Sequence, residues 1–315
     1  FIGEKGLRLN DTADSFRIGV LSRDDTLRAI NTFENSTSTQ TNRVFTFDNA
    51  SEKYNVTANL GNTSIGTMTV NGNNSTIDLK GFSGFEITLA NTILNLNDVI
   101  ITNSPVAVEL NYLDTLSEIP NVMIRDTIFA DNTVAISNNA GRIYLENSVI
   151  SESANNQFNK INNSSDGYIN VKDSKLYSSI VNNGSIIFDG TTILGKENYN
   201  VAISGNGVLS TTDSAIYTDL RYAYITDAMN NKYNNFTLNS GTLRIGSATF
   251  ATSTLIANHG LIDLSGSTDG TLAVIDRPYT IEKFISNYDA GFVIDIDFSR
   301  NEADRIVINN PDSVG

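Results

Sequence analysis

One short pattern recurs from residue 141 onward, and it restricts the possible folds more than any other feature of the chain. The pattern is Gly-x-Φ-x-Φ, where Φ is an apolar residue. Its six copies lie at 141–145, 167–171, 184–188, 207–211, 241–245 and 260–264, with Thr211 as the one polar exception. Alternation of apolar and polar residues is typical of a strand that buries one face. Each copy therefore predicts one short strand.

A second element keeps a nearly fixed distance from the first. A polar pair begins six residues after the glycine in four copies and one residue earlier in a fifth. These pairs are Asn147-Ser148, Asp173-Ser174, Gly190-Thr191, Asp213-Ser214 and Gly246-Ser247. Small polar residues and glycine favour turns, so we expect the chain to turn there into a second strand. An Asn-rich bend precedes the glycines, and we expect its amides to form ladders between successive units.

Such a unit cannot bury its apolar face alone, so the units must stack. The six glycines are spaced by 17 to 34 residues, about 24 on average. This spacing is too variable for leucine-rich repeats and too short for propeller blades. The sequence therefore predicts an all-β fold, a right-handed, single-stranded parallel β-helix (solenoid). Weaker copies of the pattern before residue 141 extend it to roughly 10–12 rungs.

The repeat divides the chain into three parts. Residues 1–60 are less regular and β-rich, and we interpret them as a cap segment over the first rung. Residues 61–271 contain the β-helix repeats, with a predicted insertion loop at about 217–236. Residues 272–315 form the C-terminal rungs. No run of about 18 apolar residues is present, so the sequence predicts no membrane helix.

Charge and composition exclude several classes of function. The formal net charge is -14 and the pI is about 4.4, so the chain repels phosphate backbones and we expect no nucleic-acid partner. The absence of Cys excludes disulfides, thiolate zinc sites and a Cys nucleophile. No metal motif occurs, and we expect neither a metal nor a cofactor.

Several stretches resemble autotransporter passenger proteins. They are ISNNAGRIYLENS at 136–148, IANHGLIDLSG at 256–266, and the tail formed by GFVIDIDF at 291–298 and EADRIVIN at 302–309. The segments at 75–85 and 94–103 also resemble polymorphic outer-membrane β-helix proteins. The resemblance implies a passenger rod of a Gram-negative bacterium, secreted or exposed at the cell surface. It further implies an adhesive, structural or virulence role rather than an enzyme.

The same resemblance implies partners. In the full-length protein an outer-membrane β-barrel, which this sequence does not contain, would anchor the passenger. Host-cell or matrix surfaces, or glycans, would be the ligands, and we expect a monomer. The resemblance carries over no catalytic residue. The alternative function is a polysaccharide lyase or hydrolase on the same fold, of the pectate-lyase or tailspike kind, which needs clustered carboxylates and a base in one groove.

The candidate catalytic groups are few. His259, the one His of the sequence, occupies a turn position of the repeat, and we expect a turn residue there rather than a base. Asp295 and Asp297 alternate with Ile294, Ile296 and Phe298. This alternation predicts aspartates in water and apolar side chains in the core, although paired carboxylates also suit Ca²⁺ or glycan chemistry. Asp126 with Arg125, and Asp173 with Lys172, are further acid–cation pairs that could approach each other across rungs. We therefore expect no catalytic site.

The predicted insertion loop carries the candidate binding residues. They are Tyr217, Tyr222, Tyr224 and Tyr233. Tyrosine offers apolar area with a polar tip, as recognition surfaces favour. Packing of these rings against the rungs is the alternative role.

Overall fold

The chain folds into strands and turns. A computed structural model describes residues 7–9, 15–18, 42–47, 53–56, 59–62, 66–89, 92–112, 121–152, 158–225, 235–245, 249–265, 279–299, 301–304 and 306–308. These residues contain no helix, and nearly all of their strands pair in parallel, which confirms the predicted all-β parallel β-helix. The chain divides into two compact units, Phe1–Tyr168 and Ile169–Gly315.

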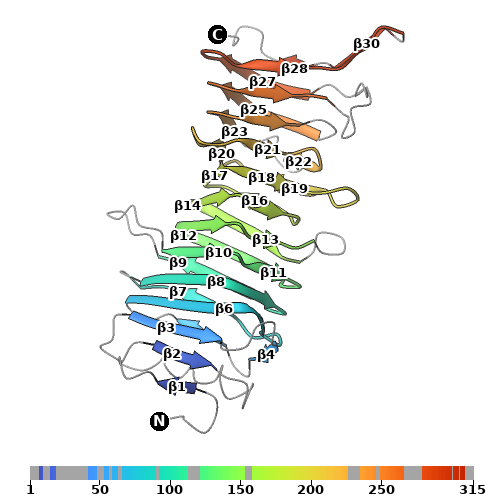
Figure 1. The fold of residues 1–315 in the computed structure, drawn as a ribbon. Helices are drawn as coiled ribbons and strands as arrows, with labels where there is room; N and C mark the ends of the chain where they lie inside the picture. The colour runs from blue at the N-terminus through green and yellow to red at the C-terminus, as the bar shows by residue number, and fades with distance from the viewer. Residues whose placement is uncertain are drawn as a thin grey trace. The chain divides into compact units, whose positions relative to one another are not determined.

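The strands of unit 1 are stacked one rung upon the next (Figure 1). Their pairings form three parallel stacks, here called sheets, which the chain visits in turn and which long strands such as β6 and β8 join into one network. The first contains β3 (Asn42–Phe47), β6 (Gly66–Asp78), β8 (Thr92–Thr102), β10 (Val122–Arg125) and β12 (Val134–Glu146). The second contains β4 (Lys53–Asn55), the ends of β6 and β8, β11 (Ile128–Ala130) and β13 (Val149–Ile150). The third contains β5 (Gly61–Asn62), β7 (Phe85–Ile87), β9 (Val106–Asn111) and the start of β12. The last strand to begin in this unit is β14 (Lys160–Lys172).

Unit 2 repeats this arrangement. Its first sheet contains β17 (Ser185–Asp189), β20 (Val208–Thr211), β23 (Asn235–Leu238), β25 (Thr249–Ala257) and β27 (Tyr279–Ser286). The second contains β15 (Lys175–Leu176), β18 (Thr191–Leu194), β21 (Tyr217–Asp219), β24 (Thr242–Arg244), β26 (Leu261–Asp263) and β28 (Gly291–Val293). The third contains β16 (Ile180–Asn182), β19 (Val201–Ser204), β22 (Ala223–Ile225) and the start of β25. β31 (Ile306–Ile308) pairs with β27.

Antiparallel pairs occur at the two ends of the described chain. β1 (Leu7–Leu9) pairs antiparallel with β2 (Ser15–Ile18), and β2 pairs in parallel with β3. β29 (Ile296–Asp297) and β30 (Glu302–Ala303) form a separate antiparallel pair. An antiparallel strand can end a parallel ladder, and the cap segment at residues 1–60 stays a prediction.

The described residues contain about seven turns of the solenoid. The sequence predicts roughly 10–12 rungs over the whole chain. Stretches such as 113–120, 226–234 and 266–278 lie outside the described residues. The larger number therefore stays a prediction.

The apolar positions of the repeat form the core. All twelve Φ positions are at most 1% exposed, from Ile143 and Leu145 in unit 1 to Ile262 and Leu264 in unit 2. Thr211, the polar exception, is equally buried, and its hydroxyl accepts a hydrogen bond from the Asn239 backbone N–H at 2.8 Å. A buried hydroxyl without such a partner would be unfavourable, so this contact explains why Thr is accepted at an apolar position.

The polar pair of the repeat forms the corner between the first and second sheets. Asp126, Asn147 and Asp173 have φ values of 50°, 48° and 49°, a left-handed conformation that Asn and Asp tolerate better than most residues. The hydroxyl that follows is buried and donates to the carbonyl two residues earlier, as in Ser148 to Glu146 at 2.8 Å. The polar pair therefore follows the glycine of Gly-x-Φ-x-Φ at a nearly fixed distance, because one strand separates the glycine from this corner.

The predicted Asn ladders are confirmed. In unit 1, Asn138 donates to the side-chain oxygen of Asn163 on the next rung at 3.0 Å, and both residues are buried. In unit 2, Asn258 donates to Asn239 at 2.7 Å and Asn287 donates to Asn258 at 2.9 Å. These amides satisfy polar groups at bends that pack against one another.

Loss of one buried ladder amide is expected to destabilise unit 1. Asn138 also donates to the Gly141 and Tyr168 carbonyls, so Asn138→Ala should lower the free energy of unfolding by about 1–3 kcal/mol. Urea unfolding measures the change. The control is Asn139→Ala, because Asn139 makes its contacts at the exposed surface and should lose less than about 0.5 kcal/mol. Equal losses in the two variants would rule out a structural ladder.

Candidate functional site

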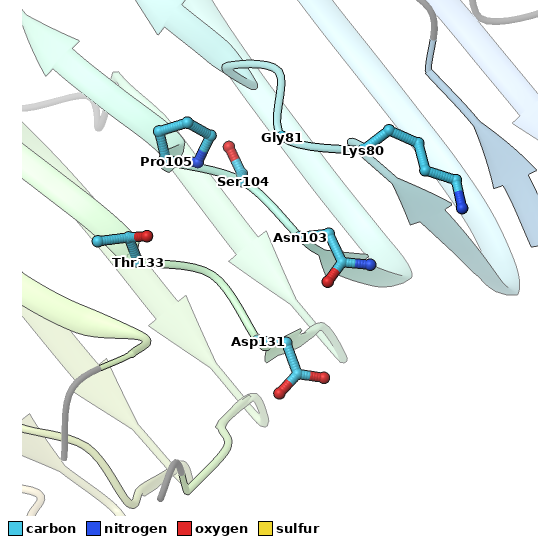
Figure 2. Close-up of a pocket in the computed structure, with 7 residues that line it drawn as sticks. All are labelled: Lys80, Gly81, Asn103, Ser104, Pro105, Asp131 and Thr133. Atoms are coloured by element: carbon cyan, nitrogen blue, oxygen red, sulfur yellow. The ribbon is translucent and has the colours of Figure 1, made fainter. Parts of the chain in front are cut away.

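A pocket of about 450 Å³ opens on the side of unit 1. It is lined by Lys80, Gly81, Asn103, Ser104, Pro105, Asp131 and Thr133. Figure 2 shows that these residues come from three separate turns, which follow β6, β8 and β11. The pocket is therefore a product of stacking, because residues 80 and 133 belong to different rungs.

The backbone of these turns sets the directions of the lining side chains. Lys80, Asn103 and Asp131 occupy equivalent positions after their strands, with φ values of 52°, 60° and 55°. This conformation turns the chain toward the third sheet and leaves the side chain exposed. Ser104, which lines the pocket, is buried, and its hydroxyl oxygen lies 2.9 Å from the Phe82 carbonyl oxygen and 2.7 Å from the Val106 carbonyl oxygen.

A buried carboxylate next to the pocket binds two of its polar side chains. Asp78 is fully buried and lies 2.7 Å from Lys53 Nζ and 3.0 Å from Lys80 Nζ. Asn103 donates to the same carboxylate at 2.9 Å. Burial alone would raise the pKa of Asp78, but the contacts from Lys53, Asn103 and Lys80 outweigh it and hold the pKa well below its usual value.

The remaining chemistry of the pocket is that of a polar binding surface. Of its lining residues, Asp131 is the one carboxylate, and Lys80 is paired with Asp78. The lining residues supply hydrogen-bond donors and acceptors beside the ring of Pro105.

Acid should remove the contribution of Asp78. Because its folded pKa is depressed, the ionised carboxylate stabilises the fold above the ordinary value of 3.8, and this contribution is lost as the pH falls below it. Asp78→Asn is expected to lower stability by about 1–2 kcal/mol at pH 7. The difference from the unmodified chain should shrink toward pH 2. Urea midpoints at pH 7, 4, 3 and 2 measure it, with exposed Asp131→Asn as the control. A constant difference over this range would show that the charge of Asp78 is unimportant.

The predicted insertion loop is in part regular structure. Residues 217–219 form β21 and residues 223–225 form β22, and both pair with neighbouring rungs. The sequence pattern did not predict these strands, because Tyr217 and Thr218 interrupt the alternation of apolar and polar residues. Residues 226–234, with Tyr233, lie outside the described residues, as does the side chain of Tyr224.

The two described tyrosines of this segment contact the unit. Tyr217 is half-buried, and its hydroxyl accepts a hydrogen bond from Arg244 at 3.1 Å. The Arg221 guanidinium lies 5.8 Å from the centre of the half-buried Tyr222 ring. The structure therefore does not gather Tyr217, Tyr222, Tyr224 and Tyr233 into one described surface, and their role in binding stays a prediction.

Two ion pairs lie near Tyr217 in unit 2. Register places Asp219, Arg244 and Asp263 at equivalent positions on three successive rungs. Arg244 Nε lies 3.3 Å from Asp263, and Arg221 Nη2 lies 2.6 Å from Asp219. The hydrogen bond to Asp219 raises the pKa of Arg221 further. Opposite charges on neighbouring strands, such as Arg244 and Asp263, stabilise the pairing of those strands.

His259 lies at an exposed turn. Its Nδ1 is 2.5 Å from the Asp289 carboxylate, and its ring stacks on Tyr288 with centroids 4.7 Å apart. The hydrogen bond to His259 lowers the pKa of Asp289. The turn position of His259 is as predicted.

The prediction that Ile294, Ile296 and Phe298 face the core is wrong. These side chains are 46%, 41% and 88% exposed. β28 ends at Val293, and the following residues leave the parallel ladder to form the antiparallel pair of β29 and β30 (Figure 1). Alternation predicts burial only where a second layer covers the strand. Asp297 accepts hydrogen bonds from the backbone and hydroxyl of Ser299, which closes the turn.

The acid–cation pairs suggested by the sequence have other partners. Arg125 pairs with Glu146 of the next rung at 3.1 Å, and Asp126 accepts a hydrogen bond from Asn147. Asp173 accepts a hydrogen bond from the Thr191 backbone at 2.8 Å. These contacts join successive rungs at the corners of each unit.

Two groups of surface residues were missed by sequence reasoning. The pocket residues Lys80, Asn103 and Asp131 could have been found by aligning the turns after the second strand of each rung. Tyr144 and Tyr168 occupy the outward x positions of the repeat. Aromatic residues at these polar positions could have marked them as candidates in the sequence.

Within the described ranges, no three His, Asp or Glu side chains are arranged to hold a metal ion. The same residues include no helix that is long and apolar enough to cross a membrane.

The chain was compared with protein-family models, curated proteins and solved structures. No protein-family model, no curated protein and no solved structure matches the chain.

Proposed function

We propose that this chain is the non-catalytic passenger of an autotransporter-like bacterial protein, secreted or displayed at the surface of a Gram-negative cell. The main support for the proposal is that many of the described polar side chains bond to neighbouring rungs. Amides, hydroxyls and carboxylates join one rung to the next, as in Asn138 with Asn163 and Asp78 with Lys53. A chain whose polar groups mainly hold the solenoid together suits display better than catalysis.

The architecture supports the same role. In a parallel solenoid each backbone strand pairs with the rungs on both sides, which satisfies its hydrogen-bonding groups without a cofactor or disulfide. Long lateral faces then remain for contacts with other molecules. On this proposal the passenger acts as a monomer, its ligands are host-cell or matrix surfaces or glycans, and an outer-membrane barrel anchors it in the full-length protein.

The alternative of a polysaccharide lyase or hydrolase has less support. Such an enzyme needs two or more carboxylates, or a carboxylate and a base, at one scissile bond. The pocket of unit 1 offers Asp131 with a lysine that is paired to Asp78. The contact of His259 with Asp289 lies on an exposed turn, where water competes with any substrate.

Adhesion provides the test of the display role. Beads coated with the purified chain should bind to host cells or immobilised matrix above the level of albumin-coated beads. Binding should persist in the presence of a chelator, because the proposal includes no metal. Retention no greater than that of albumin-coated beads on every surface would contradict the adhesive role.

A further inference from the structure

The outward face of the first sheet of unit 1 changes character along its rungs. On β6 and β8 its outward positions carry Thr69, Asn71, Asn95 and Asn97, which bond to one another. Register places Met123 and then Tyr144 in line with Thr69 and Asn95. A face of small polar side chains thus becomes a face of large rings and a thioether.

Two tyrosines and an arginine form a platform at this place, which we call the Tyr144–Tyr168 platform. The two ring centroids lie 6.4 Å apart with 35° between the planes. The guanidinium carbon of Arg142 lies 5.4 Å from the centre of the Tyr168 ring. The three side chains are half-buried, while their neighbours Ile143 and Ile169 are buried. The rings therefore project outward from β12 and β14, whose inward side chains belong to the core.

The strand that carries Arg142 and Tyr144 has no free edge. β12 pairs with β10 on one side and with β14, which carries Tyr168, on the other. An extended peptide gains affinity mainly by adding to a free strand edge, and β12 offers none. A ligand must therefore bind through the side chains.

The charges favour a neutral ligand. Arg125 and Glu146 beside the platform form an ion pair at 3.1 Å and cancel each other. The platform itself carries one cation, Arg142, in a chain with a net charge of -14 that repels polyanions at long range. Guanidinium and carboxylate groups at the rim can still donate to and accept from hydroxyl groups.

We propose that the Tyr144–Tyr168 platform binds a neutral glycan, with pyranose rings stacked on the tyrosines and hydroxyls bonded to Arg142 and Glu146. The C–H groups on the flat side of a sugar ring are weakly positive, and they match the negative face of an aromatic ring. Rings on successive rungs can contact successive sugars of one chain. This inference rests on the proposed function, because it names the ligand class that the passenger would hold.

Glycan retention on the full chain tests the proposal. The probes are immobilised neutral β-linked glucan and mannan, with a polyuronate, a sulfated glycan and gelatin for comparison. Tyr144→Leu and Tyr168→Leu keep apolar bulk but remove the flat ring, and each should weaken binding to a neutral glycan about tenfold. Tyr144→Phe keeps the ring and should bind within about threefold of the unmodified chain. The matched control is Tyr199→Leu, a partly exposed tyrosine of unit 2, which should bind like the unmodified chain. Thermal unfolding verifies that each variant is folded.

The outcomes separate this inference from the proposed function. Selective loss in the two ring variants, with little dependence on salt, supports the platform. Adhesion to cells with unchanged glycan binding in both variants would overturn the platform and leave the display role standing. Salt-sensitive binding to the anionic glycans alone would also overturn it. Cleavage of any probe would overturn the non-catalytic role instead.

Discussion

Replacement of Gly141 by Ala is expected to destabilise unit 1 by about 3 kcal/mol or more. Gly141 has a φ of 121°, a conformation that L side chains rarely adopt. A Cβ there would lie 2.6 Å from the Tyr112 carbonyl oxygen and 2.8 Å from Leu110 Cδ2. Backbone and core would both have to move. Urea unfolding followed by the far-UV β signal measures the loss.

Gly81→Ala separates the cost of a positive φ from the cost of steric contacts made by the added Cβ. Gly81 also has a positive φ, 87°, but a Cβ added to it meets no heavy atom within 4 Å. The free energy of unfolding of Gly81→Ala should fall by only about 1–2 kcal/mol, because the backbone conformation alone is unfavourable. A loss in Gly81→Ala as large as that in Gly141→Ala would show that close stacking of rungs is not the reason for the repeated glycine.

Removal of one core ring in unit 2 should have a similarly large effect. Phe236 is fully buried and stacks on Phe188, which lies two rungs earlier on β17, with centroids 6.4 Å apart and 19° between the planes. Phe236→Ala removes that contact and leaves a cavity, at a cost of about 3–5 kcal/mol. The measurement is again the urea midpoint and the slope of the unfolding transition.

The control for this variant is Phe298→Ala. Phe298 is 88% exposed, and its removal should change stability by less than about 0.5 kcal/mol. If instead Phe298→Ala were the more damaging variant, residues 294–298 would pack against a core as the sequence alternation predicts, and the assignment of β29 and β30 would be incorrect.

The core of the solenoid could be predicted from the sequence because burial follows a simple alternation. Every Φ of the six repeats faces inward, and Thr211 does so with a bonded hydroxyl. The corner after each strand was also predictable, because Asp126 and Asn147 are residue types that accept a positive φ. The core positions and the corners both follow from a few neighbouring residues, together with the need of each unit to bury its apolar face against the next.

Features that depend on the relation between rungs could not be predicted in the same way. The pocket joins Lys80, Asn103 and Asp131, which lie in three separate turns. Residues 294–298 alternate like a buried strand, but no layer covers them. β21 and β22 belong to the sheets although their apolar frame is interrupted. One sequence shows each strand, but it does not show which side chains meet across the stack.

The central claim is that the chain holds ligands and does not transform them, and depolymerisation of glycans tests it most directly. The purified full chain is incubated with neutral and anionic polysaccharides, and new reducing ends and unsaturated products are measured over time. The proposed function predicts no release above that of the heat-denatured chain. Sustained release that is lost on heating, or in an Asp131→Asn or His259→Ala variant, would contradict it and identify an enzyme.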